Sequence, residues 1–488
     1  MNPFTSEVDP IERVSRDQPL PLSVNQGAYL IAESVRRAKG GLDSEPHLPW
    51  GLEFDGELDV DAVQRWLQGL FARHEVLRTA FPDLDRVSGR KQAELLEAFA
   101  RFGYIPPSIA GASLLDSVTI PLTRLDDIPA DRSVDGDPLV SEFIQKPFDR
   151  AVAPLMRAGV ARCGVRRHLL LLVFHHLVID AASLLIMRRD FEREYCARPT
   201  APELRLQEPS VQYVDYAAWQ QQVIDGPDAM AQIEGVCARY WDRFGGRLVT
   251  ARDLWPHGAV EAPSETVVRI ERAVDRAVLT AVRHAARSLR LTSCAVWLGC
   301  VVLALYRRTR RTPVVIWTYS ANRARLEIEC LLGWFANGWP VGVEVDLEEP
   351  ANVLFARVQR AIWAVADHGE IPTSLLMRAM QRRIRPNTAT GWADDYISFD
   401  HNLVMSAPTK LGPSLTMRDA PVHSTRRQRS VDLSVVEHEV DGTLSCRHGR
   451  GHSATVAREL LDEIVRLVQM ATDQPERRVR AVLDCAQK

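Results

Sequence analysis

The alternation of apolar and polar residues along the first half of the chain predicts both helices and strands. Apolar positions that recur every three or four residues are typical of amphipathic helices, and short apolar runs between turn residues are typical of strands. The predicted helices span 26–37, 59–74, 86–103, a segment ending near 148, a segment after 181, and a long segment that follows 211–219 and ends near 244. The predicted strands span 117–122, 157–162 and 168–174.

The second half repeats this mixture of elements with a different sequence. Its predicted strands are 266–272, 313–319, 341–345, 396–402 and 432–439, and its predicted helices are 275–288, 293–306, 350–366 and 454–471. Glycines and prolines gather in residues 245–265, which is typical of a boundary. Because 488 residues are too many for one ordinary core, we expect an α/β protein of two lobes, 1–250 and 251–488.

Composition narrows the class of protein further. The chain is 46% hydrophobic and 25% charged, which is typical of a soluble globular protein, and its net charge of −3 argues against nucleic-acid binding. The longest apolar runs, 169–174 and 294–305, are too short to span a bilayer, and residues 1–21 lack the apolar core of a signal peptide. Eight scattered cysteines without a CxxC pair fit reduced thiols. We therefore expect a cytoplasmic protein with no membrane contact.

A pair of histidines ends the strand predicted at 168–174 and begins the stretch His175-His176-Leu-Val-Ile-Asp180-Ala181. Neighbouring side chains of a strand point to opposite faces, so one imidazole should face a cavity and the other the interior. Asp180 follows two apolar residues, and buried carboxylates are rarely left unpaired. A buried histidine is often only structural, and that alternative stays open beside a catalytic one. A metal site is the weakest alternative, because the imidazoles diverge and no third ligand follows at helical spacing.

Six motifs in order make the chain similar to a known family. They are Leu22–Gly27, Arg73–Phe81, Phe148-Asp149 with Pro154–Arg157, Phe174–Ala181, Tyr213–Trp219 and Leu332–Asn337. In these residues the chain resembles the condensation domains of nonribosomal peptide synthetases, within the chloramphenicol-acetyltransferase-like acyltransferases. The resemblance covers about residues 20–470. It implies two chloramphenicol-acetyltransferase-like lobes that form a V around a central substrate channel.

The resemblance also assigns roles to residues. It makes His176 the catalytic imidazole, which either removes the proton of an attacking amine or holds the substrate and the tetrahedral intermediate. His175 becomes its inward-facing structural partner, and Asp180 pairs with Arg323 to hold the loop. The candidates for lining the channel are Ala181, Trp334 and Asn337, and for Asn337 a structural role in a turn is equally open.

Four departures from the family pattern concern the substrate rather than the fold. Ala181 stands where the family usually has Gly, and its methyl group would narrow the channel. Residues 86–118 are longer and more helical than the usual link, and 367–372 follow the family pattern only loosely. Ala336 replaces the more usual Val.

The function implied by the resemblance is a free-standing condensation enzyme of secondary-metabolite and antibiotic biosynthesis. It would form an amide from a thioester on the phosphopantetheine arm of a carrier protein, or on CoA, without a tightly bound cofactor. The carrier would be supplied in trans, because no adenylation or carrier motif accompanies the domain, and the acceptor would be a small amine or a second carrier. We expect a monomer. The alternatives are ester formation, acyl-CoA-dependent transfer, a catalytically silent recruitment module and, with least support, epimerisation.

Three other polar segments were weighed as sites. His448 and His452 are separated by glycines, which favours a surface loop over a metal pair. The arginines of 307–311 end a predicted helix, where cations are favourable, and an acidic carrier or a phosphate is the alternative partner. Residues 423–429 are expected to form a solvated loop.

Overall fold

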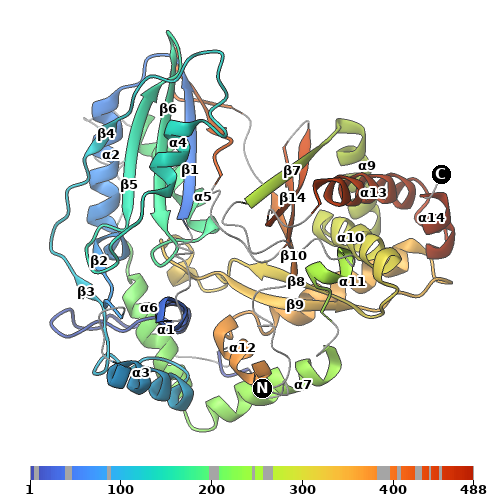
Figure 1. The fold of residues 1–488 in the computed structure, drawn as a ribbon, viewed down its shortest axis with the longest axis horizontal. Coiled ribbons are helices and arrows are strands. Elements are labelled where there is room, and N and C mark those ends of the chain that lie inside the picture. Colours follow the sequence, from blue (N-terminus) through green and yellow to red (C-terminus); the bar gives the residue numbers. More distant parts are fainter. Residues whose placement is uncertain are drawn as a thin grey trace.

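The computed structural model describes residues 2–4, 10–38, 47–84, 89–196, 208–244, 248–255, 267–381, 396–403, 408–423, 431–438, 441–449 and 453–486. Within these ranges the chain forms two lobes that diverge as a V, each built on a six-stranded sheet (Figure 1). The N-terminal lobe contains β1, β4, β5 and β6, and the C-terminal lobe contains β7–β10, β13 and β14. The two-lobed α/β fold expected from the sequence is therefore confirmed.

The sheet of the N-terminal lobe has the order β11-β12-β1-β6-β5-β4, and β6 lies at its centre. The side chains of β6 alternate between two cores, as a strand requires. Its residues 170, 172 and 174 pack in the main core with helices α2 and α5, and its residues 169, 171 and 173 pack with helix α4. This burial on both faces explains the unbroken apolar run that precedes His175.

The bounds of the elements in this lobe are as follows: α1 Val24–Ala38, β1 His47–Asp55, α2 Val60–Arg73, η1 Glu75–Arg78, β2 Thr79–Ala80, α3 Gly89–Phe102, β3 Ser113–Leu114, β4 Leu122–Arg124, α4 Pro138–Gln145, β5 Met156–Arg162, β6 Arg167–His175, α5 Ala181–Cys196, α6 Tyr213–Asp225 and α7 Ala229–Phe244.

The sheet of the C-terminal lobe has the order β7-β14-β13-β10-β8-β9. Helix α10 is apolar around its whole circumference because it is enclosed, packing against α9, α11 and α13. These helices lie on the side of the sheet away from the N-terminal lobe (Figure 1). The opposite face of the sheet is turned toward the opening of the V.

The bounds of the remaining elements are as follows: α8 Ala251–Leu254, β7 Val267–Val274, α9 Arg276–Leu289, α10 Ser293–Thr309, β8 Val314–Ser320, η3 Leu326–Ile328, β9 Asn337–Val343, α11 Ala351–Ala366, α12 Thr373–Gln381, β10 Ile397–Leu403, β11 Thr409–Lys410, β12 Thr416–Ala420, β13 Val431–Glu437, β14 Gly442–Gly449, α13 Ala454–Asp473 and α14 Val479–Cys485.

One segment crosses from the second half of the chain into the first lobe. Strand β12 pairs antiparallel with β1, so that Gly51 faces Ala420. A side chain at Gly51 would lie 2.9 Å from the Ala420 Cβ, and the crossing strand therefore needs glycine there. The division at residue 250 stays a prediction for the chain as a whole, but it does not describe residues 408–423, which belong to the N-terminal sheet.

Several predicted elements differ from the observed ones. The strand predicted at 117–122 is wrong over 117–121, since β3 ends before it and β4 begins only at Leu122. The long helix ending near 244 is two helices, because Gly226 and Pro227 interrupt it and Asp228 has a positive φ of 63°. The strand predicted at 341–345 begins earlier, at Asn337. The surface loop predicted around His448 is also wrong for that residue, which is buried in β14, whereas 450–452 lie outside the described residues.

Among the described residues, no single helix has both the length and the apolar composition needed to cross a bilayer. The bent pair α9–α10 meets that criterion only when its two helices are taken together.

Candidate functional site

The candidate site lies at the end of β6, where the first lobe meets the second. His175 is the last residue of the strand and is fully buried. Its Nδ1 accepts a hydrogen bond of 3.0 Å from the Leu177 N–H. The rings of Tyr29, Phe148 and His47 surround it at centroid distances of 5.7, 6.2 and 6.5 Å. His175 is therefore the inward-facing imidazole of the pair.

His176 points the other way and remains partly exposed. Its ring lies against the Trp334 indole from the second lobe, with the centroids 4.5 Å apart. Burial lowers the pKa of His176, while backbone hydrogen bonds and the charge of Asp180 oppose this shift. The imidazole is accordingly neutral at neutral pH, the form that can accept a proton. Ala181, which begins α5, is exposed beside this loop.

Asp180 holds the loop through six hydrogen bonds, and only 1% of the residue is exposed. Two come from Arg323, at 2.9 Å each, and two from the N–H and hydroxyl of Ser183, at 2.9 and 2.8 Å. The other two come from the N–H groups of Phe335 and Ala336, both at 3.0 Å. This carboxylate thus joins the loop after β6 to two segments of the second lobe, and it is fully occupied by a structural task.

Arg323 reaches Asp180 from the loop that follows β8. Its side chain is 8% exposed and lies over the Phe335 ring, 4.5 Å from the centroid. The preceding Asn322 has a φ of 51°, and its amide donates to the Phe335 carbonyl and to the Tyr216 hydroxyl. This left-handed residue turns the chain so that the guanidinium points at the carboxylate. The predicted pairing of Asp180 with Arg323 agrees with these contacts.

The backbone of Trp334 is fixed by a hydrogen bond from Tyr213 of helix α6. Its carbonyl accepts a 2.7 Å hydrogen bond from the Tyr213 hydroxyl, whose oxygen lies 3.0 Å from the Ser23 hydroxyl. The preceding Gly333 has a φ of 157°, and a Cβ there would lie 2.0 Å from the Tyr213 ring. A glycine is therefore required where these two segments meet. The structure shows the Trp334 indole against the His176 ring, and its role as a channel-lining residue stays a prediction.

Asn337, for which lining the channel and a structural role were equally open, is held by hydrogen bonds on both sides of its amide. It is 1% exposed at the start of β9. Its carbonyl oxygen accepts from the Asn25 amide at 2.8 Å, and its own amide donates to the Gly369 carbonyl at 2.8 Å. Because both the oxygen and the nitrogen of its amide are hydrogen-bonded, Asn337 joins helix α1 to two segments of the second lobe, β9 and the loop at Gly369. The structural alternative is the one that these contacts favour.

Two supporting residues were not singled out from the sequence. Ser183 bonds both Asp180 and Arg323, and its position three residues after the aspartate at a helix start was the available signal. Gln26 donates a 2.7 Å hydrogen bond to the Leu177 carbonyl and so fixes the loop from helix α1. Gln26 belongs to a recognised motif, but its partner lies 151 residues away and cannot be read from spacing.

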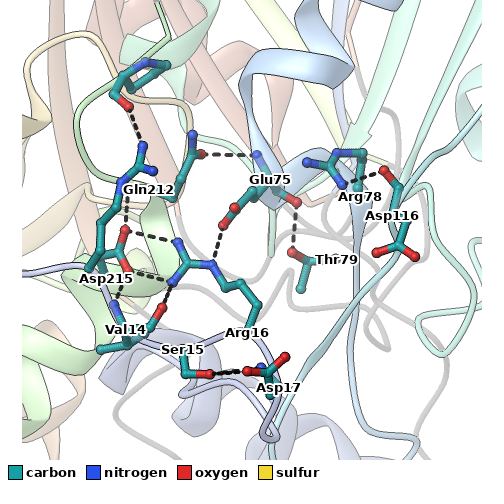
Figure 2. A network of polar contacts seen from close by, with 12 residues as sticks. Val14, Ser15, Arg16, Asp17, Glu75, Arg78, Thr79, Asp116, Gln212 and Asp215 are labelled. Atoms are coloured by element: carbon teal, nitrogen blue, oxygen red, sulfur yellow. Dashed lines mark hydrogen bonds and ion pairs between the residues drawn. The ribbon is translucent and has the colours of Figure 1, made fainter.

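A network of polar contacts joins residues 14–16 of the N-terminal segment to Glu75 of the second motif and Asp215 of the fifth (Figure 2). The Arg16 guanidinium donates to both oxygens of the buried Asp215, at 2.7 and 3.0 Å, and to Glu75 at 2.9 Å. Asp215 also accepts from the N–H groups of Val14 and Gln212, at 2.9 and 2.7 Å. Residues 14–16 therefore fasten the second and fifth motifs together close to Tyr213.

The remaining polar candidates are engaged elsewhere. Arg307 and Arg308 both pair with Glu463, so they are not two free cations at a helix end. His423 is half-buried, and burial with nearby arginines lowers its pKa to about 4, while residues 424–430 lie outside the described residues. Within the ranges that the structure describes, no three His, Cys, Asp or Glu side chains are grouped so that they could hold a metal.

Comparison with protein families gives one match across most of the chain. The model of the condensation domain matches residues 116–486. Malpinin synthetase of Mortierella alpina is 28% identical over 380 residues, which are 77% of this chain and 4% of that protein. Surfactin synthase subunit 1 of Bacillus subtilis (strain 168) is 27% identical over 369 residues, 75% of this chain and 9% of that protein. The chain thus spans less than a tenth of the length of either relative.

Solved structures share the fold over nearly the whole chain. The X-domain from teicoplanin biosynthesis superposes with a TM-score of 0.72 at 19% identity, covering 96% of this chain and 99% of that one. The condensation domain from the monacolin K polyketide synthase MokA superposes with a TM-score of 0.73 at 16% identity, covering 94% of this chain and 98% of that one. At these identities the likeness concerns the fold alone, and it confirms the predicted architecture.

Proposed function

Because the chain belongs to the condensation-domain family, we propose that it transfers a thioester-activated acyl or aminoacyl group to an amine and forms an amide bond. One observation carries the proposal. A partly exposed imidazole, His176, stands where the two lobes meet, on a loop fixed from behind by the buried pair Asp180–Arg323. His175 is fully buried among rings of the first lobe, whereas His176 contacts an indole of the second lobe.

The chemistry that this geometry supports is a direct transfer. The amine nitrogen attacks the thioester carbonyl, the C–N bond forms, and the C–S bond breaks to release the thiol. Neutral His176 either takes the proton that the amine loses or donates a hydrogen bond to the tetrahedral intermediate. In the first role its lowered pKa keeps it unprotonated at neutral pH. Asp180 takes no part in proton transfer, since its six hydrogen bonds occupy both oxygens.

The proposed donor is an acyl group on the phosphopantetheine arm of a carrier protein, or on CoA, and the proposed acceptor is a small amine or an aminoacyl group on a second carrier. This substrate class follows from the family, whose relatives include synthetases of nonribosomal peptides. An alcohol acceptor is the nearest alternative, because one relative is a cyclodepsipeptide synthetase.

Intact-protein mass spectrometry of an acyl-loaded carrier protein, incubated with the full chain and a panel of amines, tests the proposal. We expect loss of the acyl group from the carrier and appearance of the amide, with the rate reduced about 100-fold or more in His176→Ala. His284→Ala is the matched control, because His284 is an exposed histidine on helix α9. Equal rates for His176→Ala and wild type would remove the catalytic role. Parallel reactions with alcohols and with acyl-CoA decide between the proposed and the alternative substrates.

A recruitment module is the second candidate, and the likeness to an X-domain favours it, since the X-domain from teicoplanin biosynthesis forms a complex with OxyB. The same experiment separates the two functions. Binding of the carrier without turnover, unchanged by His176→Ala, would support recruitment and would count against acyl transfer.

A further inference from the structure

The face of the C-terminal sheet that is turned toward the N-terminal lobe carries a row of polar and aromatic side chains. Strand register places them side by side, in the order Arg269, Arg447, Asp432, Ser398 and Trp317. The residues next to them along each strand point the other way, into the core beneath the helices. Tyr319, two residues after Trp317 on β8, therefore lies on the same face of the sheet as this row, in which Ser398 and Trp317 are buried.

Two contacts show that this face looks across the opening of the V. His423, which follows the crossing strand β12, lies 3.4 Å from the Arg269 guanidinium. Asp135, from the loop before α4 of the first lobe, interacts with the charges of Arg269 and Glu271. The row thus faces the first lobe rather than bulk solvent.

Tyr319 lies close to the candidate site along this face. Arg323, the partner of Asp180, stands four residues after it, and Tyr319 pairs across the sheet with Gly338 of β9. Trp334, whose indole packs on His176, stands four residues before Gly338. The segment 334–338 thus connects the residue that contacts His176 to the strand partner of Tyr319.

The ring of Tyr319 is fixed at its hydroxyl end and open over its surface. The hydroxyl lies 3.3 Å from the Tyr396 hydroxyl and beside Ser398, which itself donates to Asp432 at 2.5 Å. Burial of the hydroxyl, with the neighbouring Tyr396 and Asp432, raises its pKa well above the ordinary value, so it stays protonated. Tyr319 as a residue is nevertheless 46% exposed. An aromatic surface that is both anchored and open is preorganised for contact.

On the neighbouring strand β9, Gly338 leaves room for the Tyr319 ring. A Cβ at Gly338 would lie 2.1 Å from the Trp317 Nε1 and 3.1 Å from the Tyr319 Cε1, so both rings lie across this glycine. Trp317 in turn packs on Tyr396, with the centroids 5.3 Å apart. The three aromatic rings and the glycine form one rigid patch on the wall of the V.

We propose that Tyr319 is a specificity-determining residue whose ring stacks on a planar aromatic group of the substrate. The inference rests on the proposed function only in treating the V as the place where substrate binds. The aromatic group can belong to the acyl donor or to the amine acceptor. The chemistry of recognition is the same in both cases, an offset or edge-to-face contact between rings.

Binding can be measured without turnover, in the full chain carrying His176→Ala, by saturation-transfer NMR titration. The acceptor probes are phenethylamine and hexylamine, and the donor probes are benzoyl- and hexanoyl-pantetheine thioesters. Tyr319→Leu should lower the binding affinity for one phenyl probe by about 3- to 10-fold, and the affinity for its alkyl counterpart by less than about 2-fold. The phenyl probe that responds identifies the donor or the acceptor as the source of the ring.

Two control variants test whether the effect comes from the Tyr319 ring. Tyr319→Phe keeps the ring and loses the anchor, so its phenyl affinity should fall by only about 2- to 3-fold. Trp363→Leu removes another exposed aromatic side chain (58%), on helix α11 away from this face, and should change nothing. Equal losses for phenyl and alkyl probes, the same loss in Trp363→Leu, or no phenyl preference in the parent chain would each overturn the proposal. If phenyl selectivity is found but no acyl transfer occurs in wild type, the proposed function fails and the aromatic contact stands.

Discussion

Breaking the buried pair Asp180–Arg323 should destabilise the protein by an amount that depends on which partner is removed. Loss of one member of a buried ion pair typically costs about 3–5 kcal/mol of unfolding free energy. Arg323→Ala leaves a carboxylate that keeps four hydrogen bonds from neutral donors, so we expect a loss near 3 kcal/mol. Asp180→Ala leaves the guanidinium and two N–H groups without their acceptor, so we expect a loss near 5 kcal/mol.

The double variant Asp180→Ala/Arg323→Ala should be more stable than the sum of the single changes predicts. Once the arginine is absent, removing the aspartate no longer leaves a buried charge, so the coupling should be about 2–3 kcal/mol. Urea unfolding followed by circular dichroism measures all four proteins. Arg480→Ala is the control, because its ion pair with Glu348 is exposed and should contribute nothing measurable.

Two results would refute this reasoning. Losses below about 1 kcal/mol in both single variants would mean that the pair does not support the fold as its burial implies. Additive losses in the double variant would mean that the two side chains do not interact energetically, despite the 2.9 Å contacts.

Three further outcomes follow from the geometry. His175→Ala should lower the free energy of unfolding by about 2 kcal/mol or more, because it empties a packed site, whereas His176→Ala should leave the urea midpoint nearly unchanged. Burial lowers the pKa of His74 to about 3, so the unfolded chain, with a pKa near 6.5, takes up that proton first as the pH falls. Stability should therefore drop by about 1.4 kcal/mol more between pH 7.5 and 5.5 in wild type than in His74→Gln. Arg188 donates to Asp419 of the crossing strand, and Arg188→Ala should speed amide hydrogen exchange in β12 without changing exchange in β14.

The elements that could be predicted from sequence are those whose local pattern agrees with their final environment. The apolar run of β6 is buried on both faces, and α10 is enclosed by other helices, so neither needed long-range information. Strand β1 was missed because Pro49 and Gly51 interrupt it, and Gly51 is explained only by the crossing strand that packs against it. The crossing strand β12 was missed because its partner β1 lies more than 360 residues earlier in the sequence.

The candidate site divides in the same way. The motif at 175–180 and its partner Arg323 were available from the resemblance, and the opposite orientation of His175 and His176 from strand geometry. The role of Asn337 stayed open at the sequence level, because an amide in a motif has no spacing that distinguishes lining a cavity from joining a helix to a neighbouring segment. Arg16 and Tyr319 carried no local signal at all, since their roles depend on contacts made by folding.

The crossing strand has a practical consequence for anyone who divides the molecule. A fragment of residues 1–250 would lack β12, and β1 would become an open edge with unpaired N–H and C=O groups. Such an edge tends to recruit a strand from another copy, so the fragment should self-associate. A synthetic peptide of residues 408–423, added in excess, should occupy that edge and restore a monodisperse species, and so serve as the second piece of a split reporter.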